Sequence, residues 1–407
     1  GEREFARQID VKLLLTVLAL TACGLLAIYS ATHLAESPAA QQKFTRQLLW
    51  ATLGLMVLLT TAFSPLRLFY KHAYTLYAFS LFALVLVLLV GKGAGARRWL
   101  TLGPIWLQPS EFAKVATVLA LARFLSQEHR NLRNIRDVTL AFSLAFLPLA
   151  LIIRQPDLGT SLVFLALILP ILHWAGLSPV VLFVLLAPAL SLVCAFNYYT
   201  FFAAMLLISG VLLFLRRGMA FFLANFSLNV GVGVLTPIAW NLLKGYQKNR
   251  ILTFLGLVSD PHGLGYQVIQ SKVAIGSGGL LGKGFLAGTQ THLRFLPEQH
   301  TDFIFCVIAE EFGFLGVLVV LSLFAYLVIK GFQIAMSVKS RFSSLVVFGA
   351  AVVFLFEIFV NMGMTVGIMP VTGLPLPFLS YGGSSLLSGM VFAGLMLNAS
   401  RKRFAYI

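Results

Sequence analysis

The chain has 407 residues, 59% of them hydrophobic and 11% charged, and a formal net charge of +16. Soluble domains carry roughly 25% charged residues, so these values exclude a water-soluble fold and make lipid the main solvent. The apolar stretches are continuous and recur along the whole chain, whereas a transmembrane barrel shows only weak alternating segments of about 10 residues. The composition therefore predicts an all-α polytopic membrane protein.

The excess of basic residues has a membrane explanation. The Lys and Arg residues stand at the ends of the apolar segments, where they set orientation and meet anionic lipid headgroups. The sequence contains no visible basic or aromatic nucleic-acid-binding module. We therefore expect no nucleic-acid partner.

Twelve apolar segments are predicted to span the membrane within a single domain, 1–407. They cover residues 11–30, 47–64, 73–91, 110–126, 138–153, 158–175, 179–196, 199–215, 219–243, 303–329, 343–364 and 377–399. With the N-terminus in the cytoplasm, the short cytoplasmic loops hold most of the Lys and Arg, as the positive-inside rule requires. Both termini are then cytoplasmic, and the longest polar segment, 244–302, is outside.

The first intramembrane charges lie near the outer end of segment 110–126. Glu111 and Lys114 are three residues apart, so they share one helical face. An ionisable residue at membrane depth is a functional candidate by default. The pair is therefore either a structural salt bridge or a holder for a charged substrate or metal ion.

Two further outer features flank that segment. Arg97 and Arg98 precede it, and their guanidinium groups suit a diphosphate, while the adjacent Trp99 is also typical of an interface anchor. Asp157 opens segment 158–175, where it is either an N-cap or a site residue.

The long outer segment 244–302 is too long for a simple connector. Residues 266–275 predict a short interfacial helix, with polar and apolar side chains on different faces. Residues 276–284 are rich in glycine but fail the P-loop pattern. They are either a flexible turn or a source of backbone N–H groups for a diphosphate.

The end of this segment is rich in titratable groups. Asp302 stands at the first turn of segment 303–329, at the outer membrane boundary, and Glu298 and His300 precede it. A helix N-terminus favours an anion. Asp302 is therefore either a helix cap or an active-site carboxylate.

Residues 367–385 contain three prolines and four glycines, which exclude a regular helix. Irregular backbone at membrane depth survives only where it is shielded by protein or lines a cavity, so we expect an outward-facing cavity near Ser380. Just before it, Glu357 and Asn361 are four residues apart and are predicted to form an interhelical hydrogen-bonding pair.

These motifs together resemble the SEDS family (shape, elongation, division and sporulation), which includes the RodA and FtsW glycosyltransferases, with RodA the more similar. The matching stretches are residues 95–103, 108–114, 155–161, 260–267, 270–284, 296–303 and 375–384, in the family's order. The family usually has ten spanning helices. The resemblance thus implies a ten-helix bundle with an inserted pair at 177–218 and a catalytic outer loop at 244–302.

The resemblance also implies an activity. Family members polymerise lipid II, a disaccharide-peptide on a polyprenyl diphosphate, at the outer face of the bacterial inner membrane, in cell-wall elongation. The family's essential aspartate corresponds to Asp302, as general base or ligand of an activating Mg²⁺ or Mn²⁺ ion. Glu111 and Lys114 would orient that aspartate or the substrate, and Arg98 would offset the charge of the leaving diphosphate.

The implied partners are a class B penicillin-binding transpeptidase and other elongation-complex membrane proteins. Three other functions compete with polymerisation: a lipid II flippase, an ion-coupled transporter and a scaffold. A transporter usually has paired broken segments, and only 367–385 is a clear candidate. The outer clustering of carboxylates favours chemistry outside the membrane.

Overall fold

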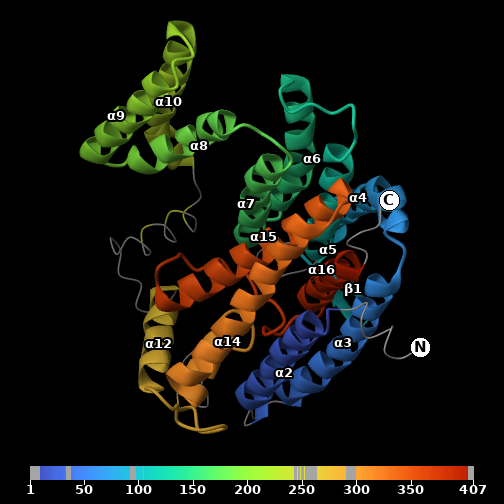
Figure 1. Ribbon diagram of the computed structural model, residues 1–407. Coiled ribbons are helices and arrows are strands. Elements are labelled where there is room, and N and C mark those ends of the chain that lie inside the picture. The colour runs from blue at the N-terminus through green and yellow to red at the C-terminus, as the bar shows by residue number, and fades with distance from the viewer. Residues whose placement is uncertain are drawn as a thin grey trace. The chain divides into compact units, whose positions relative to one another are not determined.

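The computed structural model describes residues 10–33, 38–91, 98–103, 105–242, 264–289 and 299–401, with isolated residues 245, 248 and 252. Within these ranges each of the twelve predicted apolar segments is a helix (Figure 1). The helices are α2 (Val11–His33), α3 (Pro38–Phe63), α4 (Leu66–Val90), α5 (Pro109–Leu125), α6 (Ile135–Arg154), α7 (Leu158–Trp174), α8 (Pro179–Cys194), α9 (Tyr198–Phe214), α10 (Met219–Leu242), α14 (Ile304–Ser337), α15 (Arg341–Val366) and α16 (Gly383–Arg401).

The predicted all-α polytopic membrane fold is confirmed. Eight of the described helices are long and apolar enough to cross a membrane, and α7, α8 and α9 are shorter apolar helices. A small antiparallel hairpin, β1 (Leu100–Leu102) and β2 (Ile105–Leu107), immediately precedes α5. The remaining predicted segment, α5, is 17 residues long and almost entirely buried.

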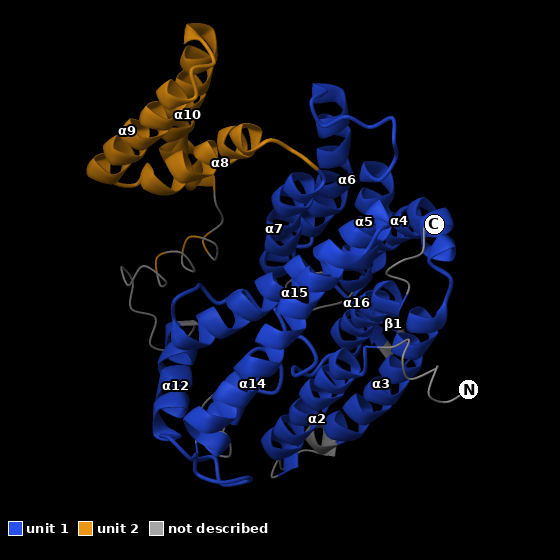
Figure 2. Cartoon of the chain, in the orientation of Figure 1, with its two compact units in different colours: residues 1–175, 260–407 blue, residues 176–259 orange. Residues whose placement is uncertain are grey.

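The chain folds into two compact units (Figure 2). Unit 1 comprises Gly1–Ala175 and Asp260–Ile407, and unit 2 comprises Gly176–Ser259. Within unit 2, α8, α9 and α10 pack around the buried residues Ala187, Ile208 and Leu212. The helices α8 and α9 fall within 177–218. Their origin as an inserted pair and the single-domain organisation stay predictions.

The centre of unit 1 is formed by α5, α15 and α16. In the most apolar 18-residue stretch of each helix, 72% of the residues of α15 and 78% of those of α16 are buried inside the protein. The helix α5 packs against both of them and also against α4, α6 and α7. Because α5 is enclosed by protein, any charge on it needs a partner from a neighbouring helix.

The predicted helix at 266–275 is also present, as α12 (Leu264–Ser277). Ile269 and Val273 are exposed on it, whereas Ser271 is buried. The hydroxyl of Ser271 donates to the carbonyl of Thr365 at 2.6 Å, which joins α12 to the end of α15.

The glycine-rich turn after α12 caps a break in α14. Within that helix Gly313 has φ 62° and ψ −160°. The backbone N–H groups of Lys283 and Gly284 donate to the carbonyls of Glu310 and Glu311, each at 3.0 Å, and Phe314 N–H donates to the Gly279 carbonyl at 2.9 Å. These bonds satisfy the helical groups that the break releases, so the N–H groups of Lys283 and Gly284 serve the fold.

Replacing Gly313 with alanine is expected to lower the free energy of unfolding. Backbone strain alone usually costs about 1–3 kcal/mol. A Cβ atom there would lie 2.3 Å from the Gly282 nitrogen, so a clash adds to the strain. The thermal unfolding temperature in detergent measures the effect. The control is Gly276→Ala, because a Cβ there meets nothing within 4 Å. Equal unfolding temperatures for the two variants would contradict this explanation.

Candidate active site

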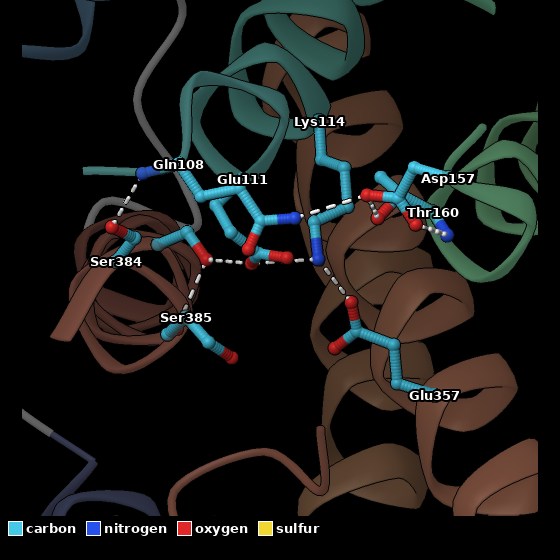
Figure 3. Close-up of polar contacts among 9 residues, drawn as sticks. Gln108, Glu111, Lys114, Asp157, Thr160, Glu357, Ser384 and Ser385 are labelled. Atoms are coloured by element: carbon cyan, nitrogen blue, oxygen red, sulfur yellow. Dashed lines mark hydrogen bonds and ion pairs between the residues drawn. The ribbon is translucent and has the colours of Figure 1, made fainter. Parts of the chain in front are cut away.

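Three buried charges link α5 to α15. Lys114 Nζ lies 2.8 Å from Glu111 Oε2 and is also hydrogen-bonded to Glu357 Oε1 (Figure 3). The side chains of Glu111 and Lys114 are each only 2% exposed. The predicted pairing of Glu111 with Lys114 is therefore present, and its geometry favours the structural alternative over direct contact with a substrate.

Two serines of α16 bond to Glu111 and to the residue that precedes α5. The Ser388 hydroxyl donates to Glu111 Oε2 at 3.0 Å, and the backbone N–H of Gln108 donates to Ser384 Oγ at 3.0 Å. The start of α5 is thereby fixed to α16, as Figure 3 shows. Removal of one charge from such a buried cluster leaves its partners uncompensated.

Glu357 and Asn361, predicted as an interhelical hydrogen-bonding pair, both bond to segments outside α15. Glu357 binds Lys114, and the Asn361 amide donates to two backbone carbonyls, those of Asp302 and Leu374. Their spacing on α15 places the two side chains on one face, and each finds its partner on another part of unit 1.

Asp157 caps α7 and joins the same region. Its carboxylate accepts hydrogen bonds from the Thr160 backbone N–H at 3.3 Å, the Thr160 hydroxyl at 3.0 Å and the Gln108 amide at 3.0 Å. The predicted capping alternative is therefore present. Through Gln108, the cap is also tied to the start of α5 (Figure 3).

Arg98 lies beside this cap. Its guanidinium is 3.9 Å from Asp157 Oδ1 and donates to the carbonyls of Gln155 and Pro156, while its side chain stays 31% exposed. The neighbouring Trp99 packs near Trp106, with ring centroids 6.4 Å apart. Arg97 lies outside the described residues.

Asp302 does not occupy the N-cap position of α14. That position is Phe303, whose side chain forms no capping bond. Asp302 is half-buried, and its Oδ2 lies against Gly373, where a Cβ atom would come within 3.4 Å. The active-site role of this carboxylate stays a prediction.

The backbone leading into Asp302 is held at three consecutive carbonyls. The carbonyl of His300 accepts a hydrogen bond from the Tyr381 N–H at 2.9 Å. The carbonyl of Thr301 accepts one from the Ser380 hydroxyl at 2.6 Å. The carbonyl of Asp302 accepts one from the Asn361 amide at 3.0 Å. Ser380 is buried, and its Oγ also accepts from the Leu376 N–H at 2.8 Å. Ser380 therefore fixes the backbone beside Asp302.

His300 contacts a cation that the sequence alone did not reveal. Lys43 Nζ on α3 lies 2.8 Å from His300 Nε2, which requires that this nitrogen carry no proton. The Tyr381 ring lies 5.6 Å from the imidazole. Burial raises the pKa of the Tyr381 hydroxyl against the opposing effect of Arg46, so the phenol stays protonated at neutral pH. Glu298 lies outside the described residues.

An apolar groove of about 700 Å³ lies elsewhere in unit 1. Its lining includes Ile275 of α12, Phe305 and Leu321 of α14, and Leu355 and Phe359 of α15. Asp302 and Ser380 do not line it. The outward-facing cavity expected beside Ser380 stays a prediction.

The described residues contain no cluster of three or more His, Cys, Asp or Glu side chains able to hold a metal ion. A protein-only metal cage is therefore not found among them. Mg²⁺ is often bound by one or two carboxylates together with substrate phosphates, an arrangement that needs only a carboxylate such as that of Asp302.

Comparison with known proteins gives matches over nearly the whole chain. Residues 11–205 and 195–404 match the family model FTSW_RODA_SPOVE, described as "Cell cycle protein". A protein of Treponema pallidum named peptidoglycan glycosyltransferase RodA is 35% identical, covering 97% of this chain and 98% of its own. The Escherichia coli K12 protein named peptidoglycan glycosyltransferase MrdB is 36% identical, with coverages of 97% and 94%.

Two solved structures are also similar. One comes from a study described as "Structural coordination of polymerization and crosslinking by a peptidoglycan synthase complex", with TM-score 0.72, 34% identity, and coverage of 97% of this chain and 98% of that one. The other is the rod shape determining protein RodA of Thermus thermophilus, with TM-score 0.64, 30% identity and coverage of 98% of both chains.

Proposed function

The chain belongs to the FtsW/RodA/SpoVE family, the SEDS family, and we infer from this membership that it is a peptidoglycan glycosyltransferase that polymerises lipid II in cell-wall elongation and maintenance of cell shape. The observation that carries this conclusion is the match to relatives named for that activity over 97% of the chain. RodA and MrdB rank before FtsW proteins among these relatives.

In the proposed reaction, the growing strand is the donor and the 4-hydroxyl of the acceptor sugar is the nucleophile. Asp302 takes the proton of that hydroxyl as the new bond forms at the donor's anomeric carbon. The bond from that carbon to the lipid diphosphate breaks on the opposite side, and the diphosphate leaves with its electron pair. An α-linked donor then gives a β-linked strand, so a single base suffices.

The setting of Asp302 supports this role. A base must lie within hydrogen-bond reach of the proton that it removes. The carboxylate is half-buried just before the N-cap residue Phe303, and hydrogen bonds hold the preceding backbone at His300 and Thr301. Because Asp302 stands at the start of a membrane helix, a bound substrate can keep its sugars in water and its polyprenyl tail in lipid.

The surrounding charges have different roles in this proposal. Arg98 is part-exposed and offsets charge on the leaving diphosphate, with Trp99 beside it. His300 and Lys43 contribute cationic or polar contacts near Asp302. Glu111 and Lys114 are too deeply buried to touch the sugars. They act through the fold, by fixing α5 to α15 and α16.

We also propose that a divalent cation, Mg²⁺ or Mn²⁺, assists. In that case Asp302 would serve as an oxygen ligand of the ion in place of its role as the base, and the substrate diphosphate would supply further ligands. When bound, the ion would neutralise charge on the diphosphate.

The protein is a multi-pass membrane protein. The proposed orientation has both termini in the cytoplasm and the active site facing the periplasm. A solved relative belongs to a complex that coordinates polymerisation and crosslinking. This supports a class B penicillin-binding transpeptidase as partner, together with elongation-complex membrane proteins.

The test is incubation of the purified protein with lipid II, Mg²⁺ and a class B partner, followed by gel analysis of the glycan product. We expect long strands, which EDTA suppresses. The alternative function, a lipid II flippase, predicts no strands but transfer of fluorescent lipid II across vesicle bilayers. Transfer without polymer would overturn the polymerase proposal.

A further inference from the structure

Asn361 on α15 is completely buried and makes two hydrogen bonds outside its own helix. Its Nδ2 donates to the carbonyl of Asp302 at 3.0 Å and to the carbonyl of Leu374 at 2.7 Å. Because both partners are acceptors, the atom facing them must be the amide nitrogen. Its Oδ1 is buried and has no hydrogen-bond partner among the described residues.

The two carbonyls belong to the two segments that surround one carboxylate. The first is the peptide carbonyl of Asp302 itself. The second follows Gly373, and Asp302 Oδ2 lies against that glycine. A single amide thus ties the backbone of Asp302 to the segment on which its side chain rests.

We propose that Asn361 is a positioning residue for Asp302, which holds the peptide of that residue and the neighbouring segment at a fixed separation. This inference rests on the proposed role of Asp302 as the general base. A base displaced by about 1 Å loses on the order of 10²-fold in rate. Asn361 therefore acts on turnover through geometry, without touching the substrate.

The chain offers a matched control in Asn398 of α16. Asn398 is also completely buried, its Nδ2 donates to the carbonyls of Thr61 at 2.7 Å and Ser64 at 2.6 Å, and its Oδ1 lacks a partner among the described residues. Those carbonyls lie at the end of α3 that leads into α4. The two asparagines thus share their burial and bonding pattern, and only one of them binds Asp302.

The experiment compares Asn361→Ala with Asn398→Ala in the full chain, measuring the unfolding temperature and the kcat and KM for lipid II. We expect similar losses of unfolding temperature. Only Asn361→Ala is expected to lower kcat, by roughly 10- to 100-fold, with KM within about twofold of the native value. Asn361→Ser, which keeps one hydroxyl donor, is expected to recover part of the lost turnover.

A folded Asn361→Ala variant with the kcat of Asn398→Ala would overturn the inference. If Asn361→Ala does not fold, Asn361→Leu decides, because it keeps the side-chain volume and removes the amide donors, and native turnover in that variant overturns the inference equally. Asp302→Asn is measured alongside. Native turnover in Asp302→Asn would refute the proposed base. An inactive Asp302→Asn with equal turnover in the two asparagine variants would refute the positioning role alone.

Discussion

Replacing Lys114 with methionine is expected to destabilise the folded protein by about 3–5 kcal/mol, the usual cost of breaking a buried ion pair by removing one partner. The ammonium lies between Glu111 and Glu357, and all three side chains are buried. Without it, two carboxylates of α5 and α15 are left uncompensated at membrane depth. The measurement is the unfolding temperature in detergent, with the yield of monodisperse protein as a second readout.

Two further variants separate the loss of the charge cluster from the loss of a lysine. Lys272→Met changes an exposed lysine of α12 and is expected to shift stability by no more than about 0.5 kcal/mol. The triple variant Glu111→Gln/Lys114→Met/Glu357→Gln removes every charge of the cluster and is expected to recover most of the lost stability. A Lys114→Met protein as stable as the native chain would contradict the structural role.

Replacing Asp302 with asparagine is expected to lower the polymerisation rate by about 10²- to 10⁴-fold, the usual contribution of a general base. The fold is expected to survive, because asparagine has nearly the same shape as aspartate and the Asn361 bond goes to the backbone of residue 302. Lipid II binding is expected to stay within a few-fold of native. The binding constant for fluorescent lipid II, measured beside the single-turnover rate, separates binding from chemistry.

Asp10 provides the matched aspartate control. It also stands at the start of a membrane helix, where its Oδ1 accepts from the Leu13 N–H at 3.2 Å and its Oδ2 pairs with Lys330 at 2.8 Å. Asp10→Asn is expected to cost up to about 1 kcal/mol of stability while turnover stays native. Equal losses of turnover in the two variants would mean that the effect of Asp302 is structural.

The spanning helices were predictable because the bilayer forces long apolar segments upon the sequence. Their ends were less predictable. Segment 377–399 is the helix Gly383–Arg401 in the structure, since Pro377 lies in irregular backbone before it. Segment 303–329 continues to Ser337, because Lys330 pairs with Asp10 beside α2 and does not end the helix.

The site was predictable where its contacts are local or carried by a motif. The Glu111–Lys114 pair follows from its spacing on one helix, and Asp302 was identified by family resemblance. Contacts between distant segments were not predictable. Glu357 pairs with a lysine 243 residues away, and Lys43 meets an imidazole 257 residues away. The one signal in the sequence that could have indicated the Glu357 contact is a carboxylate at membrane depth on α15, which needs a partner.

The role of Asp302 as the base of a lipid II polymerase is tested most directly by the glycan product of the native chain and of Asp302→Asn. Both proteins are purified, checked for equal unfolding temperature, and incubated with lipid II, Mg²⁺ and the same class B partner. Long glycan strands from the native chain and none from the variant are the predicted result. Equal strands from both proteins would remove Asp302 from the chemistry, and strands from neither would contradict the polymerase function itself.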